Sequence, residues 1–171
     1  MKQFKYTIKN IKGVYFMDSG SIILTWFAGM GLFLCLIPLV LYVFKSIGFM
    51  VMAANKGIEN AWLAWIPIAD LYIAGSIVED MDLFGTRITN LGLWLPVVMV
   101  GGIILEFIPV LGIIISLATF IFFLLYLYQL FSIYSPSQAT LFTVLSILCL
   151  WPIFVFMLRN NQPTSNQDLT I

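Results

Sequence analysis

Residues 91–158 read LGLWLPVVMVGGIILEFIPVLGIIISLATFIFFLLYLYQLFSIYSPSQATLFTVLSILCLWPIFVFML and contain one charged side chain, Glu106. No chain that folds in water could expose a stretch so long and so apolar, whereas helices of this composition suit the hydrocarbon core of a bilayer. The whole chain agrees, with 61% hydrophobic residues, 9% charged residues and a mean hydropathy of +1.03. The hydrophobic share lies above that of soluble globular domains, and the charged share lies well below it. We therefore predict an all-α, polytopic integral membrane protein.

Turn residues and charges divide the apolar sequence into about four transmembrane helices within one membrane domain. They are residues 21–55, 91–105, 110–133 and 139–158. The first is longer than a crossing requires, so we expect Lys45 to extend its ammonium group into the far headgroups while its stem stays in the lipid. Gly57 is expected to end this helix.

The segment 59–78 is apolar but broken by Pro67. It either crosses once as a kinked helix or enters the membrane and lies near the interface, and we favour the interfacial or re-entrant form. Trp62, Trp65 and Tyr72 would then be its interfacial anchors. Pro67 suits the first turn of a second short helix, which would place Asp70 near the positive N-terminal end of that helix.

Both ends of the chain are polar. Residues 1–20 carry Lys2, Lys5, Lys9 and Lys12 beside apolar residues at helical spacing, which is typical of a basic amphipathic segment that binds an anionic leaflet. The other interpretation is a positive tail that only sets topology. This pattern does not match a cleaved signal peptide. With four crossings, these lysines share a side with Arg159 and the polar tail 159–171, so the positive-inside rule places both termini in the cytoplasm.

The composition excludes several classes of chemistry. Histidine is absent, which removes the usual base of a nucleophilic site and the commonest metal ligand. Cys35 and Cys149 fall in apolar runs, where cysteine usually behaves as a small hydrophobic residue. No nucleotide loop, zinc signature or nucleophile elbow is present. With zero net charge as well, we expect no enzyme, no cofactor, no metal site and no nucleic-acid binding.

Glu106 is the first candidate for a functional acid, because an ionisable group at membrane depth usually has a functional reason. It could carry a proton or couple to a cation. The alternative is a turn carboxylate at the interface, because Pro109 and Gly112 follow closely and a helix over 91–105 is only about 22 Å long. We favour the turn.

A weaker candidate site is the loop 79–90, which should be solvated. Its charged residues are Glu79, Asp80, Asp82 and Arg87. Their oxygens could bind a divalent cation, but a charge cluster of this size more often solvates a loop or sets partner preference. Asp70 is a further weak candidate.

Three stretches of the sequence carry a resemblance. WLAWIPIADLY at 62–72, with YSPSQA at 134–139 and FVFMLRN at 154–160, resembles a group of small uncharacterised multi-pass membrane proteins of Gram-positive bacteria. The resemblance implies a bacterial cell membrane and a shared architecture, and no activity. In such proteins Asn often replaces Asp70, which argues against a mechanism that needs a charge there.

Two functions remain in view. The first is a non-enzymatic accessory or interaction subunit that binds a larger membrane complex or self-associates within the lipid bilayer. The alternative is a minimal carrier or channel for a cation or small solute, in which Glu106 is the coupling or gating acid. Four helices with no polar stripe are few for an enclosed transport path, so we favour the accessory role.

Overall fold

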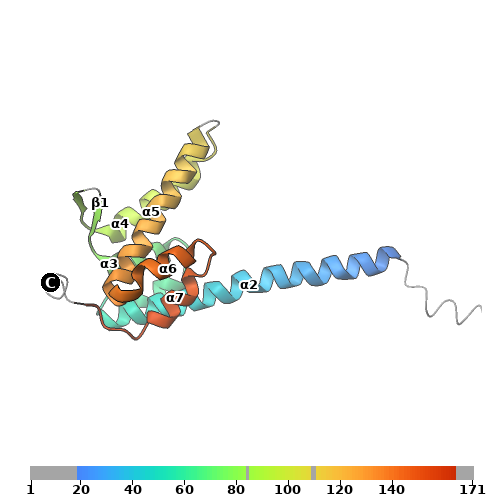
Figure 1. The fold of residues 1–171 in the computed structure, drawn as a ribbon, viewed down its shortest axis with the longest axis horizontal. Coiled ribbons are helices and arrows are strands. Elements are labelled where there is room, and N and C mark those ends of the chain that lie inside the picture. The colour runs from blue at the N-terminus through green and yellow to red at the C-terminus, as the bar shows by residue number, and fades with distance from the viewer. Residues whose placement is uncertain (1–18, 84, 109–110, 165–171) are drawn as a thin grey trace, which may run out of the picture. The chain divides into compact units, whose positions relative to one another are not determined.

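The computed structural model describes residues 19–83, 85–108 and 111–164, and these are mostly helical, as expected (Figure 1). The predicted leaflet-binding lysines, Pro109 and the tail residues 165–171 lie outside the described residues. The chain divides into two compact units, Met1–Val40 and Leu41–Ile171. The structure thus places a division inside the range 21–158 that we predicted as one membrane domain.

Helix α2 (Ser19–Asn55) contains this division. Its side chains at 21–31 and 33–40 are exposed, and most of them are large and apolar. Pro38 lies two residues before the division, where it removes one backbone hydrogen bond from the helix. The helix ends at Asn55, and Gly57 follows with a φ of 73°, so the predicted glycine stop is confirmed.

The segment 59–78 is broken, as predicted. A short 3₁₀ turn, η1 (Ala61–Trp65), precedes helix α3 (Ala69–Val78). The helix begins two residues after Pro67, and Ile68 between them has a φ of 75°. Because a residue with positive φ cannot continue a right-handed helix, the two pieces cannot join into one straight crossing.

The charged loop contains a small β-hairpin that the sequence analysis did not predict. Strands β1 (Met81–Leu83) and β2 (Thr86–Ile88) pair antiparallel, with Asp82 opposite Arg87. Gly85 takes a φ of 84° in the turn, which glycine adopts without strain. Met81 is buried, so the loop is attached to the core and only partly solvated.

Helices α4 (Leu91–Leu105) and α5 (Leu111–Tyr134) match the predicted ranges to within one residue. Figure 1 shows them side by side as a hairpin. Helix α4 packs closely on α3, because a Cβ on Gly75 would overlap the backbone of Leu91 and a Cβ on Gly92 would overlap Ser76. Small residues at such positions let two helix backbones approach each other.

The predicted crossing at 139–158 is not confirmed, because the range does not form one continuous helix. After η2 (Pro136–Gln138), the chain forms two helices of eight residues, α6 (Ala139–Ser146) and α7 (Trp151–Leu158). Cys149 has a φ of 61°, and Pro152 lacks the N–H that a continuous helix would need. The rings of Phe142 and Phe154 stack at 4.6 Å, so the two helices fold back on each other.

One hydrophobic core holds the second unit together. Its fully buried large side chains come from α2, α3, α4, α5 and α7 and from strand β1, and they are Met52, Ile73, Ile77, Met81, Leu91, Leu95, Tyr126, Leu127, Leu130, Phe131 and Val155. Among the described residues, Ser21–Asn55 and Leu111–Tyr134 are long and apolar enough to cross a membrane. Helices α6 and α7, which together cover the predicted fourth span, are each about 12 Å long. Neither is long enough to cross a membrane.

Candidate functional site

The most unusual contact in the second unit is a buried ion pair between α2 and α3. The Lys45 ammonium donates to the Asp70 carboxylate, and the two side chains are only 11% and 10% exposed. The Lys45 Nζ also lies 4.4 Å from the centre of the Tyr42 ring, a distance at which an aromatic face attracts a cation. The Tyr42 hydroxyl donates to the Trp65 carbonyl at 2.6 Å.

Local structure explains why these charges meet. Asp70 lies in the first turn of α3, where the helix dipole favours a negative charge. Lys45 shares one face of α2 with the buried residues Phe49 and Met52, at spacings of four and seven residues. When these apolar side chains pack into the core, the lysine is carried inside with them. The expectation that Lys45 extends to the headgroups is therefore wrong.

The pair sets which part of α3 faces α2. Taking two charges out of water costs about as much as their attraction returns, so a buried pair adds little net stability. Removing one partner is much more costly, because the other charge stays buried alone. Any displacement of α3 along α2 would separate the two charges in the same way, so the pair fixes the register of the two helices.

Two other buried polar groups come from the same helices and α5. The Tyr126 hydroxyl donates to the Ala74 carbonyl at 3.0 Å, which attaches α5 to α3. The Ser46 hydroxyl, next to Lys45 in sequence, is fully buried and has no hydrogen-bond partner. Sequence reasoning had singled out neither group.

A second group of charged and polar residues lies where α2, α3 and α5 end. We name this region the polar end and define it by Asn55, Lys56, Glu79, Tyr134 and Arg159. The Lys56 ammonium contacts the Glu79 carboxylate at 2.7 Å. Asn55 donates its amide to the Arg159 carbonyl at 3.2 Å. Past Arg159, the Asn161 amide donates to the Tyr134 carbonyl at 3.0 Å. The first residues of the predicted tail are thus bound to the fold.

The candidate loop is organised by ion pairs. Arg87 contacts Asp80 at 2.8 Å, and Glu79 pairs with Lys56 outside the loop. Asp82 lies opposite Arg87 in the hairpin. The described residues contain no group of three or more acidic, histidine or cysteine residues placed to hold a metal. Glu79 and Asp80 are thus each paired with a basic side chain. The loop therefore forms a charged, partly exposed surface.

Glu106 lies in the turn between α4 and α5, where it directly follows the last residue of α4 and is exposed. The three ion pairs of the described residues do not include it. It lines an open hollow of about 730 Å³ with one face of α5, including Ser116 and Phe120. The structure does not bring Glu106 together with Asp70 or with the loop acids.

The three predicted anchors all reach the surface. Trp62, Trp65 and Tyr72 are 56%, 40% and 40% exposed. The Trp65 indole N–H also points to the Met50 sulfur at 3.4 Å, so this ring contacts α2 as well as the surroundings. Amphipathic rings with this exposure are suited to a membrane interface.

Lys45 is the residue that sequence reasoning should have paired. It is the single charge between residues 21 and 55, and Asp70 is the single charge between residues 60 and 78. Two apolar segments that each carry one charge of opposite sign favour a pairing, because an unpaired buried charge is costly. That signal was present in the sequence.

Comparisons with family models, with curated proteins and with solved structures found no match for this chain. The function must therefore be argued from the residues themselves.

Proposed function

We propose that this chain is a multi-pass membrane protein and that it acts as a non-enzymatic accessory or interaction subunit of a larger membrane complex. The bacterial cell membrane is the location that the sequence resemblance favours. The proposed crossings are α2 and the α4–α5 hairpin, since the segment 139–158 is divided into two short helices.

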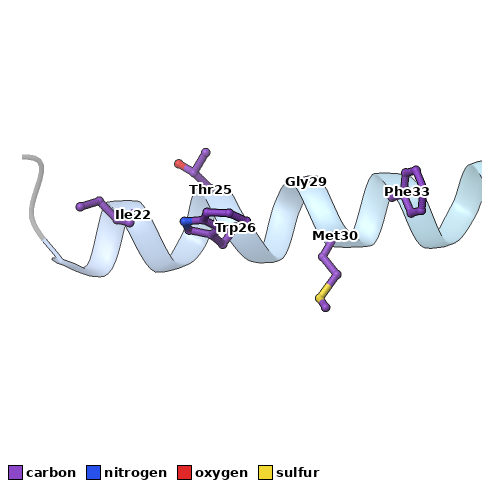
Figure 2. A pocket seen from close by; sticks show the side chains of 6 residues that line it. All are labelled: Ile22, Thr25, Trp26, Gly29, Met30 and Phe33. Carbon is purple, nitrogen blue, oxygen red and sulfur yellow. The ribbon is translucent and has the colours of Figure 1, made fainter.

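One observation carries the proposal. The described side chains of α2 from 21 to 40 are exposed, and they form an apolar surface on every face of the helix. One face contains Ile22, Thr25, Trp26, Gly29, Met30 and Phe33, which border a shallow hollow whose lining comes from α2 alone (Figure 2). A helix of this kind can bind lipid, and it can also bind another membrane helix.

The buried charges of the second unit support the same proposal. A charged group that couples to a transported cation must be able to reach it, whereas Lys45 and Asp70 bind each other inside the core. The pair lines none of four hollows on the described residues. These two charges therefore have a structural role.

The experiment is quantitative mass spectrometry of proteins that co-purify with the tagged chain from its native membrane in mild detergent. Gly29→Leu is the test variant, and Gly31→Leu, on the opposite side of the same helix, is the matched control. A Cβ added at either glycine meets nothing in this chain, so both variants should fold. We expect a near-stoichiometric partner that is reduced in the Gly29 variant. If wild-type protein brings down no partner, the proposal is wrong.

A second candidate function rests on the hollow beside Glu106. There the protein would be a minimal carrier or channel for a cation or small solute, with Glu106 as the coupling or gating acid. Its test is flux in proteoliposomes with Glu106→Gln, where loss of flux in a folded variant supports this function. Flux that does not change with the substitution removes the role of Glu106.

A further inference from the structure

The polar end gives a fixed reference for following the chain within the second unit. Its residues are linked by contacts: Lys56 to Glu79, Asn55 to Arg159, and Asn161 to Tyr134. The Leu91 amide donates to the Glu79 carbonyl at 2.8 Å, so α4 also begins there. The start and the end of each described segment of the second unit can therefore be placed either at the polar end or away from it.

The segment 57–78 leaves the polar end and returns to it. The Trp65 carbonyl accepts a hydrogen bond from the Tyr42 hydroxyl. Because Tyr42 precedes Lys45 in α2, the chain at Trp65 has run back along α2 to a point beyond Lys45. Helix α3 then runs from the Lys45–Asp70 pair to the Lys56–Glu79 pair, in the same direction as α2. Asp70 is thus about 12–15 Å from the polar end, at 1.5 Å per helical residue.

The segment 136–158 makes the same kind of excursion. It begins just after Tyr134 at the end of α5, and just after the break near Cys149 the Trp151 ring contacts Phe123 in the middle of α5. Phe142 and Phe154 stack on each other, so α6 and α7 pack together. Phe154 also contacts Phe131, so α7 runs back toward the end of α5. The Thr164 amide donates to the Ile133 carbonyl at 2.8 Å, which brings the chain back to the end of α5.

Among the described segments of the second unit, the α4–α5 hairpin extends furthest from the polar end, with α4 about 22 Å long. Helix α5 has 24 residues, about 36 Å, which exceeds the thickness of a hydrocarbon core. Gly102 packs on Thr119 near the turn, so the two helices are in close contact there. The turn with Glu106 and Phe107 therefore lies at the end opposite to the polar end.

We infer that segments 57–78 and 136–158 are two re-entrant loops that enter the membrane from the same side. The charged β-hairpin and the residues after Leu158 then share that side, and the Glu106 turn lies on the other. This rests on the proposed membrane placement. With α2 as a single further crossing, the number of crossings is odd, which replaces the expectation that both termini are cytoplasmic. A soluble partner that contacts the charged β-hairpin would therefore also be able to contact the chain after Arg159.

The experiment is single-cysteine labelling with a membrane-impermeant maleimide in intact cells and in inverted membrane vesicles. Cys35 and Cys149 are first replaced by Ala, and one cysteine is then placed at Asp82, Phe107, Leu148 or Gln162. All four positions are exposed. We expect Asp82→Cys and Gln162→Cys to label from one side and Phe107→Cys from the other. Leu148→Cys, in the break, should label from the Asp82 side or from neither.

A different outcome would overturn the inference. Labelling of Gln162→Cys from the Phe107 side would show that residues 139–158 cross the membrane after all, as would labelling of Leu148→Cys from that side. Alkaline carbonate extraction of the same membranes separates the two proposals. If the protein is released by carbonate, the membrane placement fails; if it stays in the pellet with the wrong labelling pattern, only the re-entrant arrangement fails.

Discussion

Replacing Lys45 with Met tests the role of the buried ion pair. The substitution keeps an unbranched apolar stem but leaves Asp70 without its partner at 10% side-chain exposure. Breaking a buried pair from one side costs about 3–5 kcal/mol. For a chain of this size that corresponds to a fall in melting temperature of roughly 10 °C, at about 2–4 °C per kcal/mol. The double variant Lys45→Met, Asp70→Leu should recover most of the loss, because neither charge remains.

The assay is thermal unfolding of the purified protein in mild detergent, followed by far-ultraviolet circular dichroism. Lys56→Met is the matched control, because its partner Glu79 is 69% exposed and such a pair contributes about 0–1 kcal/mol. The substitution also removes the hydrogen bond from Lys56 to the Ile77 carbonyl, which contributes about 1 kcal/mol. We expect a large shift for Lys45→Met and a small one for Lys56→Met. Equal shifts in the two single variants, or a double variant less stable than Lys45→Met, would refute the reasoning.

Two further substitutions test the packing of the second unit by the same unfolding assay. Gly75→Ala should destabilise the protein by about 1–3 kcal/mol, because its Cβ would overlap the Leu91 backbone. The control is Gly101→Ala, whose Cβ would meet no other atom, so this variant should not be destabilised. Equal losses of stability in the two variants would contradict the α3–α4 contact. Tyr126→Phe should cost about 1 kcal/mol or slightly more, since it leaves the buried Ala74 carbonyl without its donor. An unchanged melting temperature would show that this hydrogen bond is not formed.

Much of the helical architecture could be predicted because its signals are local. The bounds of α4 and α5 follow from apolar runs that end at Asn90, Glu106 and the SPSQ turn, and α2 ends before a glycine with positive φ. The break near Pro67 was predicted for the same reason. Each of these features depends on residues within a few positions of one another.

The errors concern contacts between distant segments, or local signals that the prediction did not use. The Lys45–Asp70 pair joins residues 25 positions apart, and helical periodicity does not say which charges meet. In 139–158, Pro152 is a local signal for a break, but the prediction treated the long apolar run as one span without using it. The β-hairpin has strands of three residues, too short to leave a clear alternating pattern.

The most direct test of the accessory role is the mass of the assembly that contains this chain. Native mass spectrometry of the tagged protein, extracted from its own membrane in mild detergent, reports that mass and the subunits present. The proposed function predicts a heteromeric complex with a fixed ratio of this chain to a larger membrane protein. A chain found only as a monomer or homo-oligomer would contradict it and would make cation flux with Glu106→Gln the next experiment.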